Sequence, residues 1–250
     1  MKKVLLTIFV ILYLNASFAQ QNQPLPLPKI NVELGTAKNP EDISTSLQLL
    51  LALTILAIAP SIILMTTCYL RVIIVFHFLR TALGTQQMPP NQLLAGAALF
   101  ITFFVMAPAW QKAHDEGLKP YIDKKITLDS AYSKGIAPIR EFMFKNVRQK
   151  DLELFLSIAN MPQPDNRDDI PIHILIPAYT LSELRAGFII GFFLFVPFLM
   201  IDMIVASILM SMGMMMLPPM LISTPFKILL FVLIDGWNLI VGSLVRSINL

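Results

Sequence analysis

Four long apolar runs, separated by shorter polar stretches, dominate the pattern of this chain. They cover residues 47–84, 91–110, about 183–210 and about 221–245, and the first carries no charge before residue 69. Each is about as long as, or longer than, the roughly 20 apolar residues that an α-helix needs to cross a bilayer. The pattern therefore predicts an all-α, polytopic membrane protein whose long apolar helices, about four in number, are arranged as hairpins.

Several residues mark where these helices should bend or begin. Pro60 predicts a kink, which neighbouring helices can accommodate, and residues 84–90 (GTQQMPP) predict a compact turn. Thr180 and Glu183 have the capping-box spacing, in which each side chain satisfies an amide at the start of a helix. Because this pair directly precedes the third apolar run, we expect a helix to begin there.

The polar stretch at residues 111–182 predicts a small helical domain. Gly135 is expected to stop one helix and Pro138 to lie in the first turn of the next. Apolar residues at helical spacing within 150–159 predict a helix with one buried face. Residues 161–171, which contain three prolines, are expected to form a loop.

The first residues have the pattern of a signal peptide. Two lysines precede an apolar stretch at residues 4–14, and Ser-Phe-Ala at 17–19 is a small-x-small cleavage pattern. We expect cleavage after Ala19; the alternative is an uncleaved anchor, although the apolar stretch is short for a span. Residues 20–46 form a proline-rich lead-in.

Cleavage outside the cytoplasm would place residues 84–90 in the cytoplasm. The basic residues Arg71 and Arg80, which border this connection, also favour a cytoplasmic location by the positive-inside rule. Residues 111–182 and the C-terminus would then lie on the non-cytoplasmic side. The expected organisation is a signal peptide (1–19), a lead-in (20–46), a first helical hairpin (47–110), a periplasmic helical domain (111–182) and a second hairpin (183–250).

Composition supports a membrane protein and argues against an enzyme. The chain is 56% hydrophobic and 14% charged, whereas soluble domains are roughly 45–50% apolar and about 25% charged. Its net charge is only +3 and forms no basic surface for nucleic acid. The single Cys68 excludes a disulfide framework, and His77, His114 and His173 lack the spacing of metal ligands. No catalytic residue, metal site or cofactor is expected.

Three charges lie inside the last two apolar runs: Asp202, Lys227 and Asp235. A charge at mid-membrane costs at least about 2.5–3.5 kcal/mol, so such groups usually pair or face a polar cavity. If the two runs fold as a hairpin about Leu217, Lys227 and Asp202 differ in depth by about 7.5 Å, and Lys227 and Asp235 by about 12 Å. Asp202 and Lys227 are the expected intramembrane ion pair, acting either in packing or in a proton relay.

A methionine-rich segment joins these two runs. Methionine is unbranched and polarizable, so it fills irregular gaps and adapts to varied partners. A ring of such side chains from several subunits could close a pore and still part for an extended polypeptide; alternatively, the methionines fill a packed turn. The candidate gate residues are Met210, Met212, Met214, Met215 and Met216.

The sequence resembles the FliP family of type III export-gate proteins. The resemblance runs from about residue 48 to the C-terminus and is carried by four segments: LRTALGTQQMPPN (79–91), IREFM (139–143), FLMIDMIVASILMSMGMMM (198–216) and PFKILLFVLIDGWN (225–238).

This resemblance implies a core subunit of the flagellar export gate, located in the bacterial inner membrane within the flagellar basal body. It implies a homo-oligomer, a pentamer in the family, that assembles with FliQ and FliR and passes unfolded flagellar proteins. The methionine-rich loop would constrict the channel. Energy would come from the proton motive force and an ATPase, through FlhA and FlhB.

Other functions remain open at this point. The equivalent subunit of a virulence secretion system shares the fold, although the N-terminal signal favours the flagellar branch. A small-molecule or ion transporter would use the three intramembrane charges as its binding site. A purely structural scaffold would make no contact with an exported protein.

Overall fold

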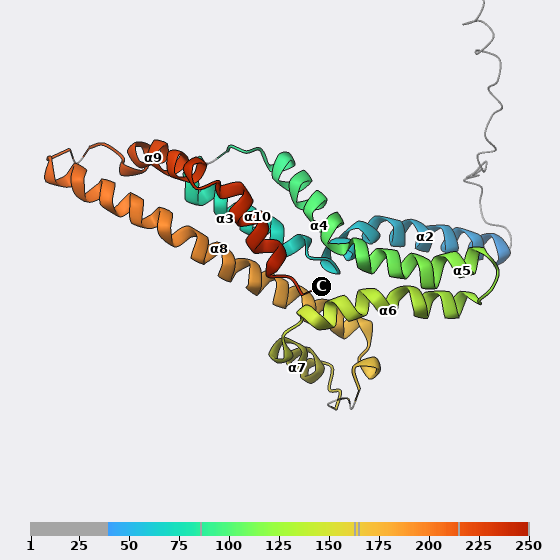
Figure 1. The fold of residues 1–250 in the computed structure, drawn as a ribbon. Helices are drawn as coiled ribbons and strands as arrows, with labels where there is room; N and C mark the ends of the chain where they lie inside the picture. The colour runs from blue at the N-terminus through green and yellow to red at the C-terminus, as the bar shows by residue number, and fades with distance from the viewer. Residues whose placement is uncertain (1–39, 86, 163, 165, 215, 250) are drawn as a thin grey trace, which may run out of the picture. The chain divides into compact units, whose positions relative to one another are not determined.

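The computed structural model describes residues 40–85, 87–162, 164, 166–214 and 216–249. Over these residues the chain is helical and contains no strand (Figure 1). Three helices are long and apolar enough to cross a membrane, and a bent pair of helices is a fourth candidate. The prediction of an all-α polytopic membrane protein is therefore confirmed.

The helices follow one another with short connections. A π-helical turn, η1, continues α4 into α5, and a single 3-10 turn, η2, precedes α8. In chain order the elements are α2 (Pro40–Met65), α3 (Tyr69–Leu83), α4 (Asn91–Ala113), η1 (His114–Leu118), α5 (Lys119–Ile122), α6 (Leu128–Asn146), α7 (Gln149–Ile158), η2 (Arg167–Asp169), α8 (Ile172–Ser211), α9 (Pro219–Leu233) and α10 (Gly236–Arg246).

The chain divides into two compact units, residues 1–52 and 53–250. In the first unit the described residues are the beginning of α2, and its side chains from Leu47 onward are exposed. The predicted signal peptide lies outside the described residues. So does the predicted lead-in, except for its last residues, which are already helical from Pro40.

The first apolar run forms two helices. α2 continues through Pro60 and ends at Met65, and α3 begins at Tyr69. At the break, the Thr66 and Thr67 hydroxyls donate to carbonyls three residues earlier, at 3.2 and 3.3 Å. Such local bonds compete with the helical pattern. The run is therefore interrupted at residues 66–68, and Pro60 lies inside the continuous helix α2.

α3 is the central helix of the second unit. It packs along α8 and also contacts α4 and α9. One part of the core joins Val72, Val75 and Phe76 of α3 to α4 and α10. A second part joins Leu79, Ala82 and Leu83 to Phe198 and Phe231. A separate cluster packs the ends of α4, α6, α7 and α8 together. Since α3 is covered on several sides, it is a protein-packed helix rather than a lipid-facing one.

The helix of the third apolar run begins earlier than the expected start at Thr180. α8 begins at Ile172, after Pro171, and passes through Thr180 and Glu183 without a break. The capping-box prediction is wrong because both side chains make other contacts. Thr180 Oγ1 lies 2.8 Å from the carbonyl of Ile176, one turn earlier in the same helix, and Glu183 is paired with a residue of α3.

In the polar stretch, the structure has one helix where the sequence predicted two. α6 runs without interruption through Gly135 and Pro138, so the predicted stop and restart are wrong. Gly135 instead forms part of a close crossing with η1, where the backbones of Gly117 and Gly135 approach each other. The predicted helix at 150–159 is confirmed as α7.

Alanine at Gly117 is expected to destabilise the protein by roughly 1–3 kcal/mol, the cost of overpacking, partly offset by the better helix propensity of alanine. Its Cβ would lie 2.7 Å from the Gly135 Cα and 2.9 Å from the Ala131 carbonyl oxygen. Backbone atoms cannot move aside as a flexible side chain can. Gly96→Ala is the matched control, since nothing lies within 4 Å of its Cβ. Equal thermal unfolding midpoints for the two variants would contradict this packing.

Candidate functional site

A buried ion pair joins α8 and α9. Lys227 Nζ lies 2.5 Å from Asp202 Oδ2 and 3.0 Å from the carbonyl oxygen of Ala82, at the end of α3. Ser223 Oγ, one turn before Lys227, donates to the other carboxylate oxygen, Asp202 Oδ1. Lys227 is only 2% exposed and Asp202 24%. The structure thus brings the two residues of the expected pair together and adds Ser223 and the end of α3 to them.

This arrangement tethers three helices through one ammonium group. The Lys227 charge is neutralised by Asp202, and its bond to Ala82 places a positive charge at the negative end of the α3 dipole. A buried charge that lost either partner would be costly. The geometry therefore favours a role in packing.

Asp235 lies away from this pair, at the break between α9 and α10. Its Oδ2 accepts a hydrogen bond of 3.1 Å from the Asn238 side chain. Asp235 has φ +51°, a left-handed conformation that is uncommon for residues other than glycine. This residue turns the chain, and the two helices meet at 67°. Asp235 is the N-cap residue of α10, but its side chain bonds to the Asn238 side chain and not to a helix amide.

The methionine-rich segment is an exposed loop between α8 and α9. α8 ends at Ser211, and Gly213 has φ +74°, which lets the chain leave the helix. Met216 is 99% exposed, and Met215 lies outside the described residues. A contiguous group of exposed large apolar side chains marks a surface that contacts another protein or the membrane. Met210, Met212 and Met214 are also exposed.

A second buried ion pair was not expected from the sequence. Arg71 of α3 donates through Nε and Nη2 to both carboxylate oxygens of Glu183 on α8, which is fully buried. Arg71 Nη1 also donates to the carbonyl oxygen of Ser247, at 2.5 Å. One guanidinium therefore joins α3, α8 and the residue that follows α10.

Sequence reasoning assigned these two residues to other roles. Arg71 served as a marker of the cytoplasmic side, and Glu183 as half of a capping box. The sequence did contain a signal for this pair, because Arg71 is a charged residue within an apolar run. The same pattern predicted that Asp202 and Lys227 need a partner.

The neighbouring Ser182 holds the start of α7 against α8. Its Oγ accepts a hydrogen bond of 3.0 Å from the amide of Arg148 and donates one of 2.7 Å to Asp151 Oδ2. The amide of a residue at a helix start has no partner within the helix. Ser182 thus supplies from α8 the partner that α7 lacks.

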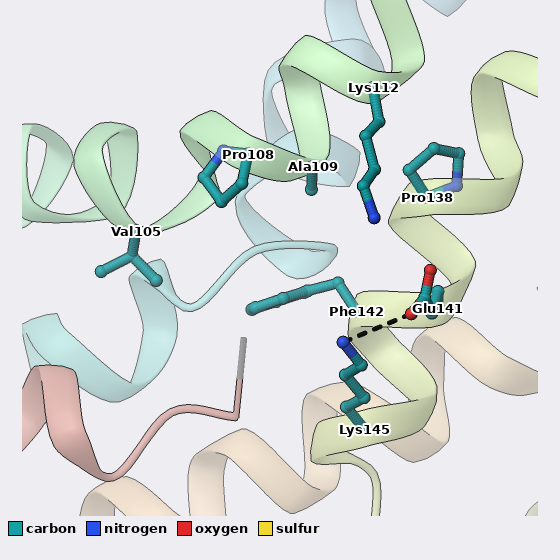
Figure 2. Close-up of a pocket in the computed structure, with 8 residues that line it drawn as sticks. All are labelled: Val105, Pro108, Ala109, Lys112, Pro138, Glu141, Phe142 and Lys145. Carbon is teal, nitrogen blue, oxygen red and sulfur yellow. Dashed lines mark ion pairs between the residues drawn. The ribbon is translucent and has the colours of Figure 1, made fainter. Parts of the chain in front are cut away.

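A small cavity of about 60 Å³ lies between α4 and α6 (Figure 2). Glu141 and Lys145 form an ion pair of 3.3 Å at its edge, and Lys112 points toward it from α4. The space is far below the roughly 300 Å³ or more typical of small-molecule sites. Among the described residues there is also no group of three or more side chains able to hold a metal ion.

The fold and these two ion pairs define a class: a polytopic, all-helical membrane protein whose helices are joined by buried charges. The sequence profile of the FliP family matches residues 52–244, most of the chain. The chain belongs to the FliP family.

Individual relatives agree with this family. The chain is 55% identical over 216 residues to the flagellar biosynthetic protein FliP of Bacillus subtilis, covering 86% of this chain and 98% of that protein. It is 47% identical to the protein of the same name from Caulobacter vibrioides, covering 87% and 81%. It is 44% identical to the protein of the same name from Treponema pallidum, and the match covers 88% of this chain and 82% of that protein.

Proposed function

We propose that this protein is a core subunit of the flagellar type III export gate and forms, with other copies of itself, the channel through which unfolded flagellar proteins cross the inner membrane. Family membership and the name shared by its relatives, flagellar biosynthetic protein FliP, support the export apparatus. The observation that carries the gate role is the exposed methionine-rich loop at the end of a hairpin held by Asp202 and Lys227.

The partners in this proposal are FliQ and FliR within the gate, FlhA and FlhB beside it, and unfolded flagellar proteins as cargo. The homo-oligomer is a pentamer, and the assembly lies in the inner membrane at the flagellar basal body. The protein is a channel subunit and not an enzyme, with export driven by other components. Exposed apolar side chains on α2, α4 and α8 support extensive contact with neighbouring subunits or lipid.

Replacing Met214, Met215 and Met216 together with alanine is expected to make the assembled complex leak ions. Alanine is too short to fill the constriction, whereas methionine side chains pack into irregular gaps. Ion flux through vesicles that contain the purified complex measures the effect. Met200→Ala with Met203→Ala is the matched control, since these exposed methionines lie on α8 outside the loop. Unchanged permeability in an assembled complex of the triple variant would count against the gate.

The same loop distinguishes a gate from a scaffold. A photo-crosslinker at Met212 should form an adduct with a stalled export substrate, and a crosslinker at Met200 should not. A scaffold without substrate contact would give no adduct at either position. The transporter alternative is disfavoured because the three charges make no common site: Lys227 bonds to Asp202 and to the Ala82 carbonyl, whereas Asp235 bonds to Asn238.

A further inference from the structure

An exposed carboxylate lies near the middle of the last apolar run, in the elbow between α9 and α10 (residues 232–238; Figure 1). The run extends from about residue 221 to 245, and the two helices together form the bent candidate span. A charge at such a depth is costly unless it pairs or faces a polar cavity. The side chain of Asp235 therefore needs a partner.

The chain supplies only part of what this carboxylate can bind. Asn238 Nδ2 donates to Asp235 Oδ2 at 3.1 Å, and among the described residues Asp235 Oδ1 accepts no hydrogen bond. An ionised carboxylate has about four acceptor positions, and its strongest hydrogen bonds come from cationic donors. Within the described part of the chain, no lysine or arginine forms an ion pair with Asp235.

The surface next to Asp235 is apolar and exposed. Val232 and Leu233, which precede it, are 68% and 75% exposed, and Trp237, which follows it, is 43% exposed. No other charged residue occurs between Lys227 and Arg246. Contiguous exposed apolar side chains mark a contact surface. A contact surface with a single carboxylate is complementary to a partner surface that is apolar and carries one cation.

Aromatic packing holds the elbow in place. The Trp237 ring packs edge-on against Phe231 and against Phe76 of α3, with ring centroids 5.5 and 6.1 Å apart. A Cβ at Gly236 would lie 2.2 Å from the Phe231 ring, so glycine is what allows this packing. A group that is already held in position loses little conformational entropy when it binds. The elbow is therefore preorganised as a contact point.

A second copy of this chain does not offer a suitable cation among its described residues. Arg71 and Lys227 are the cations deep within apolar runs, and both are already paired, with Glu183 and Asp202. The other arginines in or beside the runs stand near the run ends, away from the depth of Asp235: Arg80, Arg185 and Arg246. The missing cation is therefore expected on a different polypeptide.

We propose that the elbow binds a membrane helix of a different polypeptide, whose lysine or arginine lies within an apolar segment and pairs with Asp235. The pair neutralises both charges where water is scarce, and the exposed apolar side chains of the elbow cover it. It also fixes the register of the two helices, because only one alignment brings the charges together. This inference rests on the protein working in a multi-subunit complex, as proposed above, but not on the methionine-rich loop acting as a gate.

The first test is crosslinking in native membranes, with a photo-crosslinker in place of Leu233. Mass spectrometry should identify an adduct with a membrane polypeptide other than this chain, at a segment that has one lysine or arginine among apolar residues. Adducts only with another copy of this chain, only with lipid, or with a segment that has no cation would overturn the proposal.

Substitution tests the charge itself. Asp235→Asn should lower the amount of this partner recovered with the purified complex roughly tenfold or more, because the partner's cation is left buried and unpaired. Asparagine tolerates a left-handed backbone, so the unfolding midpoint of the variant should stay near that of the unmodified protein. Replacing the partner's cation with methionine should restore binding to the variant, since both charges are then absent.

Asp129→Asn is the matched control, because it removes an exposed carboxylate from the first turn of α6. It should leave the composition of the complex unchanged. Recovery of the partner that is equal for Asp235→Asn and Asp129→Asn would contradict the proposed pair.

Carbodiimide labelling distinguishes a protein partner from water. A water-soluble carbodiimide with glycine ethyl ester should modify Asp129 in the assembled complex and leave Asp235 unmodified, because the partner helix covers it. Equal modification of both would show that Asp235 faces water and would refute the pairing. These measurements report the neighbours of Asp235 and not ion leakage or export, so they can fail while the gate proposal stands, and the gate proposal can fail while they succeed.

Discussion

Arg71→Ala is expected to destabilise the protein by about 3–5 kcal/mol, because it leaves the fully buried Glu183 carboxylate without its partner. The carbonyl of Ser247 loses its donor as well. A loss of this size is a large fraction of the 5–15 kcal/mol that stabilises most folded domains. The measurement is the thermal unfolding midpoint of the purified protein, together with its amount in the membrane.

The exposed pair between Lys125 and Asp123 is the matched control, since its side chains are 72% and 42% exposed. Lys125→Ala should cost no more than about 1 kcal/mol. Arg71→Met combined with Glu183→Leu should recover much of the lost stability, because it removes both buried charges together. If Arg71→Ala proved no more harmful than Lys125→Ala, the buried pair would not be holding these helices.

Lys227→Ala is expected to have an effect of similar size, about 3–5 kcal/mol. It removes the group that joins Asp202 to the end of α3 and leaves a carboxylate within the helical hairpin. Unfolding midpoints and the yield of assembled complex measure the loss. Asp202→Asn should cost a comparable amount, since it leaves the more deeply buried Lys227 ammonium without its counter-charge, although the amide oxygen can still accept a hydrogen bond from Ser223.

A double substitution distinguishes packing from proton transfer at this pair. If Asp202 and Lys227 serve packing, Asp202→Leu with Lys227→Met should assemble and support export, because two apolar side chains of similar size replace the buried pair. Loss of export by an assembled, stable complex of this variant would instead favour the proton relay. Exchanging the two charges is expected to rescue only partly, since an aspartate at position 227 would face the Ala82 carbonyl oxygen.

The apolar runs predicted the class of fold and most helices because a span must satisfy its backbone internally, which makes long apolar helices the default. The errors arose where a tertiary contact replaced a local one. Gly135 has the chemistry of a helix stop, but in α6 it allows a close approach to Gly117. Thr180 and Glu183 have the spacing of a cap, but their bonds belong to the interior of α8 and to Arg71.

In the candidate site, too, local geometry was predictable from the sequence and long-range contacts were not. Asp202 and Lys227 were predicted as a pair because their depths in a hairpin follow from helix rise alone. Arg71 and Glu183 are 112 residues apart in different runs, so no local spacing relates them. The bend at Asp235 was also beyond sequence reasoning, since a left-handed conformation is unusual for an aspartate.

The separation of Arg71 from Glu183 also bears on the order in which the protein is made. During synthesis α3 emerges long before α8, so the Arg71 side chain exists for a time without the carboxylate that neutralises it. An unpaired arginine is poorly tolerated in the bilayer interior. We therefore expect nascent α3 to wait at the membrane surface, or beside an insertase, until α8 arrives. We expect α3 to reach its final position only when its contacts with α8 form.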